Sequence, residues 1–171
     1  MAALVRSGVM PDSSHVWWMV RPSAKYPTLE LRAPDCCPRL DDAIALTALY
    51  RALARHLFLH PDRNRDLSPV ERAIAQENKW RAQRYGVRGT FATKDGPVTV
   101  AEVLGQVLEM VWDDAEILGC AQELARCRTI VTEGTSADAQ LALFEDRERD
   151  EGREAALAAV AHWIARTTVE T

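Results

Sequence analysis

From Pro38 to the end of the chain, apolar residues recur every three or four positions, which is the period of an α-helix with one buried face. Two segments here begin with a capping box, SPVE at 68–71 and TVAE at 99–102, in which a hydroxyl and a carboxylate satisfy the first free N–H groups of a helix. The sequence TSAD at 135–138 is typical of a third helix start. Helices are predicted over 38–60, from 69 to Gly86 and from 100 to a break at Gly119, after which the helical stretch continues to Gly134. Two more helices are predicted, one from 136 to the charged stretch 145–154 and one from that stretch to about 168. A short strand is predicted over 87–93, before an Asp95-Gly96 turn.

The N-terminal part has a different pattern, because it contains two short β-like runs and little helical spacing. Residues 15–20 are aromatic and β-branched, and residues 28–32 alternate polar with apolar side chains. The segment 21–27 between them is typical of a turn, so the two runs are predicted to form a wide hairpin. The predicted fold class is therefore α+β, mostly helical (38–171) with a small antiparallel sheet fragment (1–37).

The length and charge of the chain restrict its function. Its 171 residues suit about one domain, and 21 Lys and Arg against 25 Asp and Glu give a net charge of −4. There is no overall positive field to attract nucleic acid or an anionic membrane, so we expect neither as a partner. No apolar run approaches the roughly 18 residues of a membrane span, and the first ten residues lack the core of a signal peptide. We therefore expect a cytoplasmic protein.

The cysteines and histidines do not have the spacing of a zinc site. Cys36 and Cys37 are adjacent, and Cys120 and Cys127 lie far from them in the sequence. We expect reduced thiols, with the Cys36-Cys37 pair buried and structural beside a helix start, although a redox role for the pair stays open. The histidines at 56 and 60 are four residues apart but lack the glutamate of a helical zinc protease site, so no zinc enzyme is predicted.

The strand predicted over 28–32 carries the clearest candidate chemistry. Because alternate residues share a face, Leu29 and Leu31 are predicted to face the core, while Glu30 and Arg32 lie side by side on the other face. A carboxylate can hold Mg²⁺ and a guanidinium can neutralise phosphate oxygens, so the pair suits phosphoryl chemistry. Taken alone, the pair is better explained as a solvated ion pair on a sheet face.

Other arginines add candidates for anion binding. Arg21 is predicted to lie in a turn that Pro22 makes rigid, where it could point at an anionic substrate or simply at solvent. Residues 51–88 contain nine Lys and Arg against four Asp and Glu, a local charge of +5, and Asn78, Arg81 and Arg84 share one helix side. This patch could face an anion, the acidic 145–154 stretch or a partner subunit.

Six motifs occur in one collinear order and together resemble a known family. They are W-W-x-x-R-P-S (17–23), P-T-L-E-L-R (27–32), D-C-C-P-R-L-D-D-A (35–43), A-L-Y-R (48–51), E-N-K-W-R-A-Q-R-Y-G (77–86) and E-G-T-S-A-D (133–138). This combination resembles the bacterial carboxylate–amine ligases of glutamate–cysteine ligase family 2, and residues 1–171 are similar to the C-terminal half of their catalytic chain.

The resemblance implies a glutamine-synthetase-like catalytic fold, in which an antiparallel sheet curves around the site and helices back it. Members use ATP and Mg²⁺ to phosphorylate a substrate carboxylate, typically the γ-carboxylate of glutamate, and an amine such as that of cysteine then displaces phosphate. By this resemblance, Glu30 is implied to be a ligand of the Mg²⁺–nucleotide complex, and Arg32 a contact for the γ-phosphate or acyl phosphate. Arg21 is implied to be a substrate-side residue.

The chain also departs from the family pattern. Met19 stands where members often have an aspartate. The resemblance also implies that the first half of the family's chain, which this sequence does not match, supplies the remaining Mg²⁺ carboxylates and much of the sheet. We therefore expect a fragment that acts as a homo-oligomer or with a missing N-terminal half, and that by itself binds MgATP weakly if at all. The alternative function is a non-catalytic helical module for dimerisation or regulation.

Overall fold

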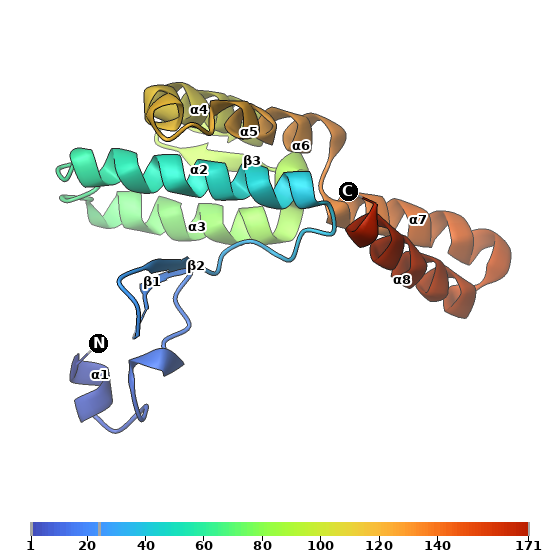
Figure 1. Ribbon diagram of the computed structural model, residues 1–171, viewed down its shortest axis with the longest axis horizontal. Coiled ribbons are helices and arrows are strands. Elements are labelled where there is room, and N and C mark those ends of the chain that lie inside the picture. Colours follow the sequence, from blue (N-terminus) through green and yellow to red (C-terminus); the bar gives the residue numbers. More distant parts are fainter. Residues whose placement is uncertain (1, 24, 171) are drawn as a thin grey trace. The chain divides into compact units, whose positions relative to one another are not determined.

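The computed structural model describes residues 2–23 and 25–170, which form two compact units, one up to Cys36 and one from Cys37 onward (Figure 1). Ala24, in the turn predicted between the first two strands, lies outside the described residues. The elements in chain order are α1 (Ala2–Arg6), η1 (Ser13–His15), β1 (Val20–Pro22), β2 (Leu29–Leu31), α2 (Leu40–Leu59), α3 (Pro69–Tyr85), η2 (Gly86–Arg88), β3 (Thr90–Thr93), β4 (Gly96–Thr99), α4 (Val100–Ile117), α5 (Ala121–Ala125), α6 (Cys127–Glu133), α7 (Ser136–Glu151) and α8 (Arg153–Val169).

The first unit contains the predicted hairpin. Strands β1 and β2 are antiparallel, with Val20 opposite Leu31 and Pro22 opposite Leu29. The prediction of a strand over 15–20 was wrong, because the aromatic run precedes the strand and β1 begins only at Val20. Pro22, predicted as turn material, belongs to β1. A two-stranded sheet accepts it, because each strand has an open edge where no N–H donor is needed.

The side chains of β2 do not divide as predicted. Leu29 was predicted to face the core but is 54% exposed, whereas Leu31 is half-buried. A two-stranded hairpin has too little area to cover an apolar face by itself, which explains why Leu29 remains exposed.

The core of the second unit lies between α2 and α4. Ala45, Ala48 and Ala52 of α2 are buried, and they share a cluster with Leu108 and Val111 of α4. Small alanines at a spacing of three and four allow the two helices to approach closely, so that the larger side chains of α4 fill the space between them. The helix predicted over 38–60 is confirmed within two residues at each end.

Helices α5 and α6 pack on the same core and complete it with Leu124 and Cys127. The predicted break at Gly119 is confirmed. Its φ of +68° lies in the left-handed region that glycine tolerates, and the next residue, Cys120, donates its N–H to the Ala115 carbonyl at 2.9 Å. This closure ends α4 and turns the chain back toward α2.

Helix α3 packs against the β3–β4 hairpin and begins with the predicted capping box, since the Ser68 hydroxyl accepts from the Glu71 N–H. The strand predicted over 87–93 is confirmed only in its second part, β3, because Gly86–Arg88 form the 3-10 helix η2. Its partner β4 was not predicted, because a four-residue strand that contains Gly96 and Pro97 has low β propensity.

Helices α7 and α8 form an antiparallel pair in the second unit (Figure 1). The predicted cap at Thr135 is confirmed as a capping box with Asp138. The charged stretch 145–154 was predicted to separate two helices, but α7 continues through it to Glu151. Solvent-facing charges are compatible with a helix, and Arg147 pairs with Glu151 one turn further on.

Together these elements confirm the mostly helical α+β class. In residues 2–23 and 25–170 the strands form two separate two-stranded sheets, so a sheet curved around a site is not seen in this part. None of the helices described is long and apolar enough to cross a bilayer.

Candidate active site on the β1–β2 hairpin

The register of the hairpin brings Arg21 and Glu30 together. They are direct partners in the β1–β2 ladder, and residues opposite each other in an antiparallel pair lie on the same face. Arg21 Nε donates to Glu30 Oε2 at 2.8 Å. Sequence reasoning had named both residues, but it had placed Arg21 in a turn and had not paired the two.

Arg32 joins the same face from the end of β2. Its Nη1 lies 3.7 Å from Glu30 Oε2, and its guanidinium lies 4.5 Å from the ring centroid of Trp17. The backbone N–H of Arg32 donates to the Met19 carbonyl at 2.7 Å, which extends the ladder by one bond. The predicted placement of Glu30 and Arg32 side by side on one face is therefore what the structure shows.

The two arginines differ in how firmly they are held. The side chain of Arg21 is only 12% exposed, and its Nη1 also donates to the carbonyls of Ser14 (2.6 Å) and Val16 (2.9 Å). The side chain of Arg32 is 34% exposed and rests against Trp17. Arg21 is thus fixed inside the unit, whereas Arg32 keeps N–H donors available for a ligand.

Glu30 is the only carboxylate of this three-residue cluster, which carries a net charge of +1. Both guanidinium contacts fall on Oε2, and no hydrogen bond from the described residues reaches Oε1. Mg²⁺ that is bound with a nucleotide often takes one or two carboxylates and fills its other positions with water and phosphate oxygens. Glu30 Oε1 fits one such position.

The remaining ligands of such a site are not found in this part of the chain. Across residues 2–23 and 25–170, no group of three or more His, Cys, Asp and Glu side chains is placed to hold a metal ion. Within the described residues, the three-residue cluster on the hairpin thus offers one carboxylate, that of Glu30.

A second polar cluster, which sequence reasoning missed, lies buried between α2 and α4. Asp114 accepts from His56 Nδ1 at 2.8 Å through Oδ2 and from Arg55 Nη1 through Oδ1. The ring of His56 also stacks on that of His60, with centroids 4.3 Å apart. The signal in the sequence was Asp114 itself, a carboxylate on the apolar stripe of α4 between Val111 and Ala115.

Asp114 remains ionised despite its burial. Desolvation raises its pKa, but the hydrogen bonds from His56 and Arg55 and their charges outweigh this effect, so the pKa lies below its usual value. Asp114 joins His56 and Arg55, both of α2, to α4, while the buried His56 Nε2 has no hydrogen-bond partner among the described residues. We interpret the cluster as a structural tie between α2 and α4.

The basic side of α3 has a structural role. Asn78 Nδ2 donates to the Ala92 carbonyl at 2.9 Å, and Asn78 Oδ1 accepts from the Ala92 N–H at 2.7 Å. The side-chain amide thus makes the two hydrogen bonds that the backbone of a neighbouring strand would make. Arg81 donates to the carbonyl and the hydroxyl of Thr90, and Arg84 lies over the ring of Tyr85. Asn78 and Arg81 therefore cover an open edge of β3.

The cysteines only partly follow the prediction. Cys36 was predicted to be buried but is exposed, and Cys37 is half-buried. Cys127 lies in the core, where burial raises the pKa of its thiol to about 11. A thiol with so high a pKa is protonated at neutral pH and is a poor nucleophile, so Cys127 serves packing.

The chain is similar to known proteins over almost its whole length. The family model of glutamate–cysteine ligase family 2 matches residues 1–160. Proteins provisionally named glutamate–cysteine ligase 2 are similar to 99% of the chain at 52% identity in Bradyrhizobium diazoefficiens and at 57% in Bradyrhizobium sp. strain ORS 278, and to 96% of it at 42% in Rhodospirillum rubrum. The chain spans only 38%, 40% and 43% of the length of these three relatives.

Proposed function

The chain belongs to glutamate–cysteine ligase family 2, and from this premise we propose that it is part of an ATP-dependent carboxylate–amine ligase that joins glutamate to an amine such as cysteine. The observation that carries the proposal is the cluster of Arg21, Glu30 and Arg32 on one face of the hairpin. It combines a carboxylate for a metal–nucleotide complex with a guanidinium that can reach phosphate oxygens.

The proposed reaction has two steps. An oxygen of the γ-carboxylate of glutamate attacks the γ-phosphorus of ATP, the bond to the β-phosphate oxygen breaks, and ADP leaves. The amine nitrogen then attacks the acyl carbon, the bond to phosphate breaks, and the amine loses a proton as the amide forms. Both steps concentrate negative charge on phosphate oxygens, which a fixed cation stabilises.

Each residue of the cluster has a distinct role in this proposal. Arg32, which is partly exposed and rests against Trp17, binds the oxygens of the transferred phosphate. Glu30 offers Oε1 as one oxygen ligand, and Mg²⁺ supplies charge neutralisation at the phosphates when it is bound. Arg21 is a positioning residue, because its bonds to two backbone carbonyls fix the carboxylate of Glu30.

The proposal needs a second polypeptide segment. The chain spans about two fifths of its relatives, and the hairpin cluster contributes a single carboxylate. The hairpin has two open strand edges and exposed apolar side chains, Trp17 (78%) and Leu29 (54%) among them. Such edges pair readily with further strands. We propose that they join a larger glutamine-synthetase-like sheet.

The alternative of a non-catalytic module is not favoured. The family match includes the hairpin as well as the helices, and the hairpin retains the charged cluster. A module used only for dimerisation has no need of a carboxylate held between two guanidinium groups.

The test is ADP release from ATP, glutamate and cysteine. The chain is co-expressed with a polypeptide that corresponds to the remaining part of the Bradyrhizobium diazoefficiens relative, and the complex is assayed with and without each substrate. Glu30→Gln is expected to lower turnover at least about tenfold, because it removes the charged ligand but keeps the shape. Glu109→Gln, which changes an exposed carboxylate on α4, is the matched control. Full turnover by Glu30→Gln would refute the role of Glu30.

A further inference from the structure

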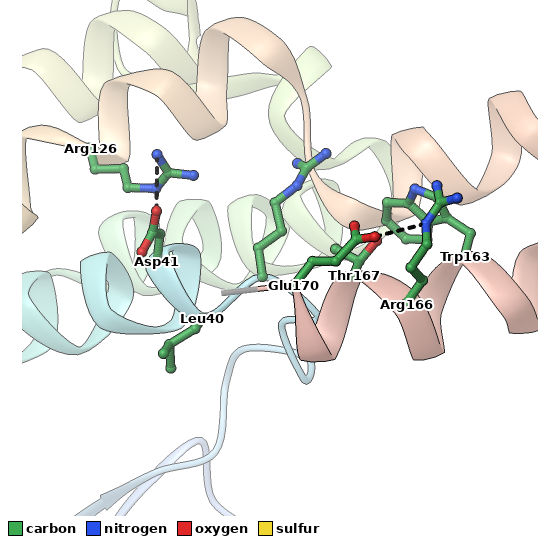
Figure 2. Close-up of a pocket in the computed structure, with 8 residues that line it drawn as sticks. Leu40, Asp41, Arg126, Trp163, Arg166, Thr167 and Glu170 are labelled. Carbon is green, nitrogen blue, oxygen red and sulfur yellow. Dashed lines mark ion pairs between the residues drawn. The ribbon is translucent and has the colours of Figure 1, made fainter.

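The second unit contains a pocket that the proposed ligase cluster does not use. Its volume is about 450 Å³, within the usual range for small-molecule sites. Figure 2 shows side chains from the start of α2, from the α5–α6 junction and from the last turns of α8 around it. The pocket is lined by Arg39, Leu40, Asp41, Arg126, Trp163, Arg166, Thr167 and Glu170.

One of its three arginines is already neutralised. Arg126 donates to Asp42 Oδ1 through Nε at 3.2 Å, and its Nη2 lies 3.1 Å from the same oxygen. Its Nη1 lies 3.7 Å from Asp41 Oδ2, the ion pair drawn in Figure 2. Asp42 is buried, so Arg126 is a fixed wall of the pocket rather than a cation free to bind a ligand.

The other two arginines retain their hydrogen-bonding capacity. The contact of Arg39 with Asp42 is 4.0 Å long, and that of Arg166 with Glu170 is 3.4 Å long between exposed side chains. Each of these ion pairs involves a single guanidinium nitrogen, Nη1 of Arg39 and Nε of Arg166. Each can therefore offer a planar pair of N–H donors, which matches the two oxygens of a carboxylate or phosphate.

Trp163 and Thr167 strengthen such contacts, whereas Asp41 and Glu170 place two carboxylates in the same wall. Trp163 is half-buried on α8, and the guanidinium of Arg39 lies 5.9 Å from its ring centroid. A ring beside the guanidinium excludes water from one side and so strengthens a hydrogen bond to an anion. The hydroxyl of Thr167, one residue after Arg166, adds a neutral donor.

We propose that this pocket binds a small molecule that carries two oxyanion groups, one held by Arg39 and one by Arg166. The shared chemistry is a pair of phosphates or carboxylates on a compact molecule, because the volume admits a small metabolite and the two cations come from different segments, Arg39 just before α2 and Arg166 on α8. The inference does not rest on the proposed ligase activity, since none of its residues belongs to the hairpin.

The test uses calorimetric titration of the 171-residue chain with two probes, pyrophosphate for the phosphate source and glutarate for the carboxylate source. We expect one saturable site for at least one probe, and the probe that binds identifies the source. Arg39→Gln and Arg166→Gln are each expected to weaken binding about tenfold or more. Arg149→Gln, which changes an exposed arginine on α7 outside the pocket, is expected to bind as the unchanged chain does.

Three results would overturn the proposal. They are no binding of either probe, equal binding by both pocket variants and the unchanged chain, and equal weakening by Arg149→Gln, which would mean non-specific attraction. Circular dichroism of each variant checks its helices. Should Arg39→Gln disturb the start of α2, Arg166→Gln decides the matter, because Arg166 is exposed and its ion pair among the described residues is with Glu170, directly after α8.

Discussion

The hairpin of the first unit and the α2–α4 layer of the second are held together by different forces. In the hairpin, Arg21 connects a strand, a carboxylate and two backbone carbonyls through charged hydrogen bonds, and among the described residues of this unit Val16 alone is a buried apolar side chain. In the helical layer, alanines of α2 pack on large side chains of α4. The part that carries the candidate chemistry is thus the part with the least apolar burial, which fits a surface that is completed by another segment.

The largest effect is expected in the helical layer. Leu108 is fully buried on α4, and Leu108→Ala is expected to lower the free energy of unfolding by about 2–5 kcal/mol, since it removes apolar contacts and leaves a cavity. Urea denaturation followed by circular dichroism measures the loss. Leu141→Ala, at a position 61% exposed on α7, is the control and should change little. A small effect at Leu108 would mean that this core is not what holds the unit together.

The helical layer also contains a buried charged group, Asp114, whose contribution to stability can be measured separately. Asp114→Asn is expected to destabilise the protein by about 1.5–3 kcal/mol, because it weakens charged hydrogen bonds to His56 and Arg55 in a buried position. The exposed neighbour Asp113 provides a matched control, Asp113→Asn, in the same denaturation experiment. Equal stability of the two variants would show that the cluster does not connect α2 and α4.

A smaller effect is expected in the hairpin. Arg21→Gln removes the bond to Glu30 and those to the carbonyls of Ser14 and Val16, which we expect to cost about 1–2 kcal/mol locally. Amide hydrogen exchange of Arg32, whose N–H bonds to the Met19 carbonyl, should then be about tenfold faster or more. Exchange at the same rate as in Arg6→Gln, an exposed control, would contradict the view that Arg21 fixes the hairpin.

The smallest effect concerns the exposed cap of α3. The pKa of Glu71 is lowered to about 2, because the Ser68 hydroxyl, the Lys94 ammonium and the Ser68 backbone N–H bind its charged form. A folded value below the ordinary 4.5 means that ionised Glu71 stabilises the fold above pH 4.5, and that this is lost as the pH falls toward 2. The difference in melting temperature between the unchanged chain and Glu71→Gln should therefore shrink over this range. A constant difference would contradict this assignment.

Local patterns were sufficient for most of the helices. The capping boxes at Ser68 and Thr99 are signals within a few residues, and both are confirmed. The placement of Glu30 beside Arg32 also follows from local alternation in one strand. The sequence reasoning succeeded where the physical cause lies within one or two turns or one strand.

Contacts across long sequence distances were not predictable in the same way. The pairing of Arg21 with Glu30 depends on the register of the hairpin, which neither strand specifies alone. The bond between His56 and Asp114 joins residues 58 positions apart. The position of strand β1 was predicted wrongly, because the high β propensity of residues 15–20 shows only that their side chains suit a sheet. The strand itself begins at the end of this run, at Val20.

The most direct test of the central claim is the turnover of an Arg32→Gln variant in the complex with the remaining part of the relative. If Arg32 binds the transferred phosphate, kcat for ADP release should fall by about 100-fold or more, because one fixed cation at the developing charge is lost. Arg6→Gln, in the same unit, should retain the original rate. An unchanged kcat in Arg32→Gln would contradict the assignment of the hairpin cluster to phosphoryl transfer.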